Sequence, residues 1–131
     1  MKKQIPIVVL TMITISLFVA LSGCTVMQYK KEISSTSIEA IDLNRVADGK
    51  YEGFYDVYYL NARVEVSVQN HHIVDIRLVE HKHDKHSGEP MIQKVIDAQS
   101  LDVDTISGAT NSCKTVLKAI EIALSKGETK K

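Results

Sequence analysis

Apolar residues are distributed unevenly along the chain. Ile5 to Leu21 is an almost continuous apolar run, whereas Thr25 to Thr36 is polar and is expected to be a tether. Ser37 to Ala47 carries apolar residues at spacings that suit a short helix. We expect this helix to lead into a folded domain that begins at Asp48.

The first half of the domain alternates between apolar and polar side chains, which is the pattern of half-buried strands. Short turn sequences such as Asn70-His71 separate the alternating runs. We therefore predict three strands in an antiparallel meander. The residues expected on one face are Tyr51, Tyr55 and Tyr59 in the first strand, Val64, Val66 and Val68 in the second, and Val74, Ile76 and Leu78 in the third.

The second half of the domain changes to helical spacing. His81 to Glu89 is polar and is expected to be a loop, and Pro90 suits the first turn of a helix because a missing N–H costs nothing there. After a further loop, a second helix is expected from Asn111 or Ser112. Strands followed by helices predict an α+β fold, a small antiparallel sheet with two helices packed on it. The predicted buried face of the second helix is Cys113, Val116, Leu117, Ile120 and Leu124.

The charge balance of the chain argues against one class of function, the binding of nucleic acids. The chain has 16 Lys plus Arg and 16 Asp plus Glu, so its formal net charge is zero with neutral histidines. Proteins that bind nucleic acids normally carry a basic excess, and we therefore expect no nucleic-acid partner.

The apolar start has the features of an export signal. Lys2 and Lys3 precede the apolar run, and small residues follow it. The segment Leu21–Cys24, with the sequence LSGC, resembles the lipobox of bacterial lipoproteins, in which the cysteine is lipidated and becomes the new N-terminus. The alternative is an uncleaved membrane anchor, because the apolar run is nearly long enough to cross the ~30 Å bilayer core. Either interpretation places the domain on the extracytoplasmic face of the cell membrane.

These features divide the chain into four parts. Residues 1–23 are predicted to be a lipoprotein signal peptide and 24–47 a tether with a short lead-in helix. Residues 48–126 form the domain and 127–131 a charged tail. Lipid attached at Cys24 would hold the domain at the bilayer.

The strongest candidate for chemistry lies between the two predicted helices, at Asp104–Ser112. A glycine in a tight turn, several hydroxyl groups and a following helix N-terminus together suit a bound phosphate. Free backbone N–H groups and the positive end of the helix dipole favour an anion there. The alternative is an ordinary capped helix, since Ser, Thr and Asn are common N-caps.

Three segments, in the same order, resemble the FMN-binding domain found in flavin-carrying subunits of sodium-translocating NADH:quinone reductase and of Rnf complexes. Asp48–Gly53 is similar to the family's opening Asp-Gly-x-Tyr-x-Gly, and Ile73–Ile76 is similar to its third-strand pattern. Ile96–Asp104 is similar to the run before the family's Ser-Gly-Ala-Thr motif, which stands here at Ser107–Thr110. The resemblance implies FMN as the cofactor.

The resemblance also implies how the cofactor is held. In covalent members of the family, a hydroxyl two residues past the Ala-Thr pair is joined to the FMN phosphate, which gives Ser112 in this chain. The usual acceptor is threonine, but serine supplies the same oxygen. Thr110 is the nearest other hydroxyl, and non-covalent FMN stays open. A separate flavin transferase, using FAD and a divalent metal, would form the bond. The implied recognition motif and phosphate cradle are Asp104, Ser107, Gly108, Ala109 and Thr110.

Histidines in the predicted loop after the third strand offer a different kind of site. His81, His83 and His86 could bind zinc or copper if a fourth ligand came near. Lysines between them oppose a cation, so a solvated loop is the preferred interpretation. In the family this loop lies where the flavin ring is bound, so a role beside the flavin is equally open.

Two further groups of side chains have structural interpretations. The tyrosines between Tyr51 and Tyr59 suit a strand with exposed rings, and contact of one or two rings with the flavin is the less favoured alternative. Cys113 shares the apolar face of its helix and is expected to be a buried small residue rather than a redox thiol.

Together these inferences predict an exported lipoprotein that carries electrons on FMN at the outer face of the membrane. A lone small domain offers little room for a substrate pocket, so an electron carrier is favoured over an independent oxidoreductase. The expected partners are a quinone- or NADH-linked membrane reductase, the flavin transferase and the lipid bilayer. The alternative is a metal-binding or structural surface lipoprotein without a working flavin site.

Overall fold

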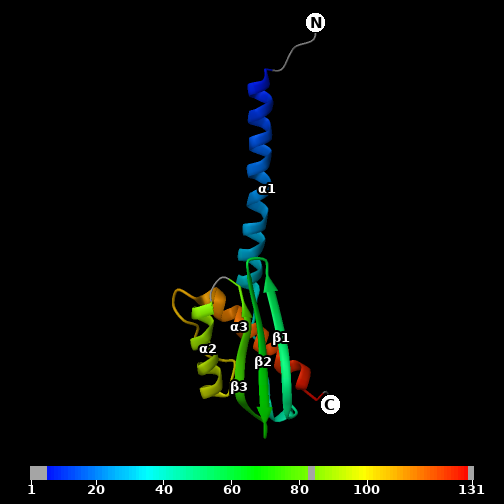
Figure 1. Ribbon diagram of the computed structural model, residues 1–131, viewed down its shortest axis with the longest axis vertical. Coiled ribbons are helices and arrows are strands. Elements are labelled where there is room, and N and C mark those ends of the chain that lie inside the picture. Colours follow the sequence, from blue (N-terminus) through cyan, green and yellow to red (C-terminus); the bar gives the residue numbers. More distant parts are fainter. Residues whose placement is uncertain (1–5, 83–84, 130–131) are drawn as a thin grey trace.

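The computed structural model describes residues 6–82 and 85–129, in which a long helix projects from a small α+β domain (Figure 1). Lys2 and Lys3 of the predicted signal peptide lie outside the described residues. Within those residues, no helix is long and apolar enough to cross a membrane. The elements in chain order are α1 (Ile7–Ser35), η1 (Leu43–Arg45), β1 (Gly49–Val57), β2 (Leu60–Gln69), β3 (His72–His81), α2 (Lys85–Ala98) and α3 (Thr110–Gly127).

The predicted α+β class is confirmed. The strands form one antiparallel sheet in the order β1-β2-β3; α3 packs across β1 and β2, and α2 packs against β3 and α3 (Figure 1). The alternation predicted for the central strand is confirmed, because Val64, Val66 and Val68 are buried. The predicted face of α3, from Cys113 to Leu124, is also buried. Removal of these apolar surfaces from water holds the sheet and α3 together.

The third strand departs from strict alternation at two bulges. Register shifts leave Val74 and Val79 each as an extra residue opposite β2. Both valines are about half exposed, whereas Ile73 and Ile76 are buried. The prediction that Val74 faces the core is therefore wrong, because a bulge inserts one residue and changes which side chains point inward.

The segment before the domain differs from the prediction in two ways. Residues 25–35, expected to be a polar tether, belong to α1, and Ile33 is buried. The lead-in helix expected within 37–47 is instead extended chain with the single 3-10 turn η1. The backbone there finds partners outside the segment: Glu39 N–H donates to the Glu121 carboxylate at 3.0 Å. Such contacts replace the hydrogen bonds that a helix would supply.

Two element boundaries also differ from the prediction. Helix α2 begins at Lys85, so Pro90 lies inside the helix and the expected loop is shorter. The proline removes one helical hydrogen bond, and burial of Met91 and Val95 in the core offsets that loss. Strand β1 ends before Tyr59, which lies in the β1–β2 turn rather than on the strand face.

Candidate functional site

The predicted phosphate turn is a reverse turn that leads directly into α3. Ala109 N–H donates to the Ile106 carbonyl at 3.0 Å and closes the turn around Ser107 and Gly108. Gly108 has a φ of +84°, a conformation that glycine adopts without steric cost. A Cβ atom placed on Gly108 would meet nothing within 4 Å. The backbone conformation therefore favours glycine at this position. The space beside the Gly108 Cα is open to a ligand.

The start of α3 has the features of an anion-binding helix N-terminus. The N-cap residue is Ala109, whose methyl side chain cannot accept a capping hydrogen bond, and no acidic residue lies in the first turn. The Cys113 N–H donates to the Ala109 carbonyl at 2.9 Å. Three backbone N–H groups come before that first helical bond and have no helical acceptor, those of Thr110, Asn111 and Ser112. They lie at the positive end of the helix dipole. A cavity of about 240 Å³ lies against the turn and these three residues.

The two hydroxyls considered as acceptors differ in exposure. Thr110 is the first residue of α3 and is exposed, whereas Ser112 is only 6% exposed. Thr110 is therefore more accessible to a second protein that would attach a cofactor. The predicted site residues that line the small cavity are Gly108, Ala109, Thr110 and Ser112.

Asp104 and Ser107 belong to the same segment but do not line that cavity. Both residues are exposed. The Asp104 carbonyl accepts a hydrogen bond from Lys94 Nζ at 3.0 Å, which ties this loop to α2.

On one side, the first turn of α3 contacts α1. Asn111 Nδ2 donates to the Tyr29 hydroxyl at 3.2 Å. Tyr29 packs edge-on against Tyr59, with ring centroids 5.7 Å apart and ring planes at 81°. Sequence reasoning assigned Tyr29 to the polar tether. Tyr29 and Ile33 are four residues apart, and this spacing is the pattern that indicates a helical contact face.

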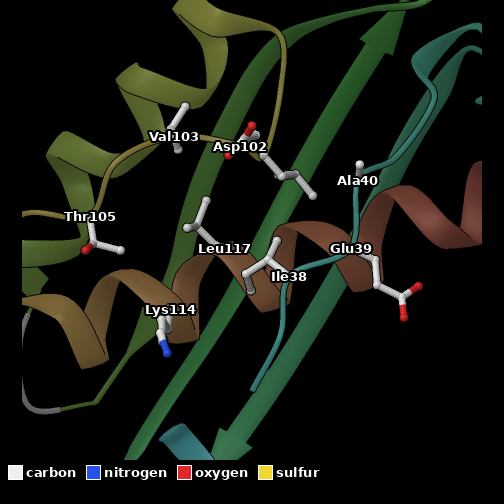
Figure 2. A pocket seen from close by; sticks show the side chains of 9 residues that line it. Ile38, Glu39, Ala40, Asp102, Val103, Thr105, Lys114 and Leu117 are labelled. Carbon is white, nitrogen blue, oxygen red and sulfur yellow. The ribbon is translucent and has the colours of Figure 1, made fainter. Parts of the chain in front are cut away.

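A second cavity, of about 280 Å³, lies along a neighbouring face of α3 (Figure 2). Lys114 and Leu117 line it from α3, Val103 from the loop after α2, and Ile38 from the chain before η1. Thr110, Lys114 and Leu117 are four and three residues apart and so share one helix face. Sequence reasoning missed this cavity, although that spacing was available to suggest a common face.

The histidines do not form a metal site within the described residues. No group of three possible metal-binding side chains occurs there. His81 is buried, and its Nδ1 donates to the Asn61 carbonyl at 2.7 Å, while its buried Nε2 has no hydrogen-bond partner among the described residues. His83 and the side chain of His86 lie outside the described residues. The metal-binding alternative therefore gains no support from the part of the chain that is described.

The first of the family-like segments, Asp48–Gly53, has a structural role. Backbone N–H groups of Asn70 and His71 lie against the Asp48 carboxylate and hold its pKa below the usual range. The carboxylate thereby stabilises the β2–β3 turn, in which Asn70 and His71 both have positive φ. This segment is not part of the phosphate turn.

A family model described as an FMN-binding domain matches residues 58–125, about half of the chain. The match extends from the β1–β2 turn almost to the end of α3 and includes the whole phosphate turn. Asp48–Gly53 lies before the matched residues. No curated protein matches the chain.

Proposed function

Because the chain belongs to the FMN-binding domain family, we propose that it is a membrane-anchored, extracytoplasmic flavoprotein that carries electrons. FMN is the cofactor that membership implies. When bound, FMN supplies the redox chemistry, and the protein supplies binding, orientation and electrostatics. The observation that carries the proposal is the start of α3 behind the Gly108 turn, whose free N–H groups suit the phosphate.

The residues of this turn fit a phosphate in three respects. The open side of Gly108 allows a ligand to approach the backbone closely. The N-cap is Ala109, so no side chain competes for the free N–H groups, and no carboxylate in the first turn repels an anion. The alternative of an ordinary capped helix thus loses its main support, because capping depends on a side-chain oxygen.

Exposure favours Thr110 over Ser112 as the residue that carries the phosphate. A transferase must bring FAD to the acceptor hydroxyl, and Thr110 is exposed at the first position of α3 while Ser112 is nearly buried. The Thr110 oxygen would bond to the phosphorus that bears the riboflavin. AMP would leave as the phosphoanhydride bond breaks, and the hydroxyl proton would pass to solvent or to a base of the transferase.

The anchor proposed at Cys24 would place this turn close to the membrane. Tyr29, which contacts the first turn of α3, follows Cys24 by five residues, a helical rise of about 7.5 Å. A lipid-anchored chain would therefore hold its flavin near the bilayer surface. This arrangement suits exchange of electrons with a quinone- or NADH-linked membrane reductase, and it supports a carrier rather than an independent oxidoreductase.

Co-expression with a flavin transferase tests the proposal. Denaturing gels of the wild type should show a fluorescent band, and the purified protein should have a flavin absorbance spectrum. Thr110→Ala should lose the band, while Thr110→Ser and Ser112→Ala should keep it. Loss in Ser112→Ala alone would move the attachment to Ser112. A colourless wild type would overturn the carrier function and favour a structural lipoprotein.

A further inference from the structure

We infer that the β1–β2 turn enters the headgroup region of the bilayer through the rings of Tyr58 and Tyr59, as a second membrane contact beside the anchor at Cys24. This inference rests on the proposed lipid anchor, and it assigns a lipid surface as the partner of one defined end of the domain. Three observations carry it: the backbone conformation of Tyr58, the exposure of both rings and the position of the turn.

Tyr58 has a backbone conformation that does not suit its side chain. Its φ is +51°, in the left-handed region that bulky residues rarely adopt and that turns normally fill with glycine or asparagine. The ring does not offset this cost inside the domain, because it is 54% exposed and makes no ring contact or side-chain hydrogen bond with the described residues. Folding therefore does not account for a tyrosine at this position, and a strained residue of this kind points to a function.

The turn presents two aromatic rings and no charge. Residues 57–60 contain no charged side chain, and within them Val57 is buried and Leu60 half-buried. The exposed surface of the turn therefore belongs to Tyr58 and Tyr59, which is 46% exposed. A tyrosine ring is apolar with one polar hydroxyl group, and tyrosine is accordingly enriched at the boundary between the headgroups and the acyl chains. A pair of such rings at the tip of a hairpin suits this boundary.

The turn lies at the end of the domain from which α1 projects, whereas the β2–β3 turn lies at the opposite end of the sheet (Figure 1). Tyr59 packs against Tyr29 of α1, with ring centroids 5.7 Å apart. Tyr29 follows Cys24 by a helical rise of about 7.5 Å, and helical side chains tilt back toward the N-terminus. The headgroup layer on each side of a bilayer is about 5–8 Å thick. The rings beside Tyr29 are therefore within reach of a bilayer that holds a lipid on Cys24.

The side chains around the turn define the kind of surface that it fits. Val26 and Met27 are exposed on the part of α1 between Cys24 and Tyr29, and they extend the apolar surface toward the anchor. Among the described residues, three lysines and three acidic residues flank the turn: Lys30, Lys31, Lys82, Glu32, Asp56 and Glu80. Because these charges balance, the contact depends on the aromatic rings rather than on attraction to anionic lipid. A bilayer of neutral phosphatidylcholine is therefore sufficient for it.

Tryptophan reporters in the lipidated full chain test the contact. The chain contains no tryptophan, so one substitution supplies the whole tryptophan signal. Tyr58→Trp is the reporter and Val74→Trp the matched control, because Val74 is 48% exposed and lies near the β2–β3 turn at the opposite end of the sheet. In phosphatidylcholine vesicles, a lipid with a nitroxide near its headgroup should quench Tyr58→Trp several-fold more than Val74→Trp. Acrylamide in the water should quench the two reporters in the opposite order.

A second reporter covers the case in which Tyr58→Trp does not fold. Tyr59→Trp keeps an aromatic ring beside Tyr29, and the nitroxide lipid should quench it as well. Adding Tyr58→Asn to this reporter should reduce the quenching by the lipid and raise the urea midpoint of unfolding, because asparagine suits the positive φ. A lower urea midpoint would show that the Tyr58 ring stabilises the fold, and it would overturn the inference.

Two further results would overturn the inference while the protein stays bound to the vesicles. The first is equal quenching of Tyr58→Trp and Val74→Trp by the nitroxide lipid. The second is protection of Tyr58→Trp from acrylamide without quenching by the lipid, which would mean that the flavin or another protein covers the turn. A mature chain whose mass shows no lipid and that does not float with the vesicles would instead overturn the proposed anchoring at Cys24.

Discussion

Asn111 donates a hydrogen bond from Nδ2 to the Tyr29 hydroxyl at 3.2 Å, and this bond joins the first turn of α3 to α1. Tyr29 also packs edge-on against Tyr59 of the β1–β2 turn, and Ile33, one turn further along α1, is buried. The end of α1 is therefore fixed on the domain beside the phosphate turn. In a lipid-anchored chain, this contact would set which end of the domain faces the membrane.

Removing the Tyr29 ring should release the end of α1 from the domain. Tyr29→Ala loses both the ring contact and the hydrogen bond, so trypsin should cleave after Lys30 and Lys31 several-fold faster than in the wild type. Tyr29→Phe keeps the ring and loses only an exposed hydrogen bond worth about 1 kcal/mol or less, so its cleavage should stay close to that of the wild type. Equal cleavage rates in all three proteins would show that the contact does not hold α1.

Replacing Gly108 should damage the phosphate turn through its backbone. At a φ of +84°, a β-branched residue costs about 1–2 kcal/mol, while no neighbouring atom opposes the added Cβ. Gly108→Val should therefore unfold at lower urea concentration and carry less flavin, with its strands intact by circular dichroism. Gly108→Asn should retain more of its stability and more of its flavin than Gly108→Val, because asparagine tolerates the left-handed region. Full flavin content in Gly108→Val would remove this turn from the site.

Gly53 should be intolerant of any side chain, for a steric reason. A Cβ there would collide with the Ala119 carbonyl and lie 2.8 Å from the Ala123 nitrogen, so α3 would have to move away from β1. We expect Gly53→Ala to lower the free energy of unfolding by about 3 kcal/mol, the upper part of the range for overpacked sites. Gly49→Ala is the control, since its Cβ would meet only the Tyr51 side chain, at 3.2 Å. Equal stability of the two variants would contradict this account.

Sequence periodicity predicts the parts of the fold in which one face is buried along the whole element. Alternation at Val64, Val66 and Val68 defines β2, and the helical spacing from Cys113 to Leu124 defines the buried face of α3. It fails at Val74, because a bulge changes the alternation without leaving a mark in local composition. It also fails at residues 25–35, whose helix is stabilised by contacts with distant parts of the chain.

The turn before α3 was predictable from the sequence to a similar degree. The Ser107–Thr110 motif located the turn, and the structure adds the φ of Gly108 and the free start of α3. The proposal of Thr110 rather than Ser112 as the phosphate acceptor rests on the exposure of the two side chains. That exposure depends on how α3 packs on the sheet. The cavity over Leu117 brings together segments from before β1 and after α2, and no local pattern contains such a juxtaposition.

The membrane attachment itself should depend on Cys24. If a diacylglycerol is attached there, its two acyl chains provide stable anchoring, and the mature chain from native membranes should begin at Cys24 with a mass increased by the lipid. Cys24→Ala should leave the N-terminus uncleaved and mislocalise the protein, while FMN attachment in the separate domain continues. Cys113→Ala is the matched control and should stay in the membrane fraction, because Cys113 is buried in the core. An unchanged membrane position and an uncleaved N-terminus in both the wild type and Cys24→Ala would instead indicate a plain N-terminal anchor.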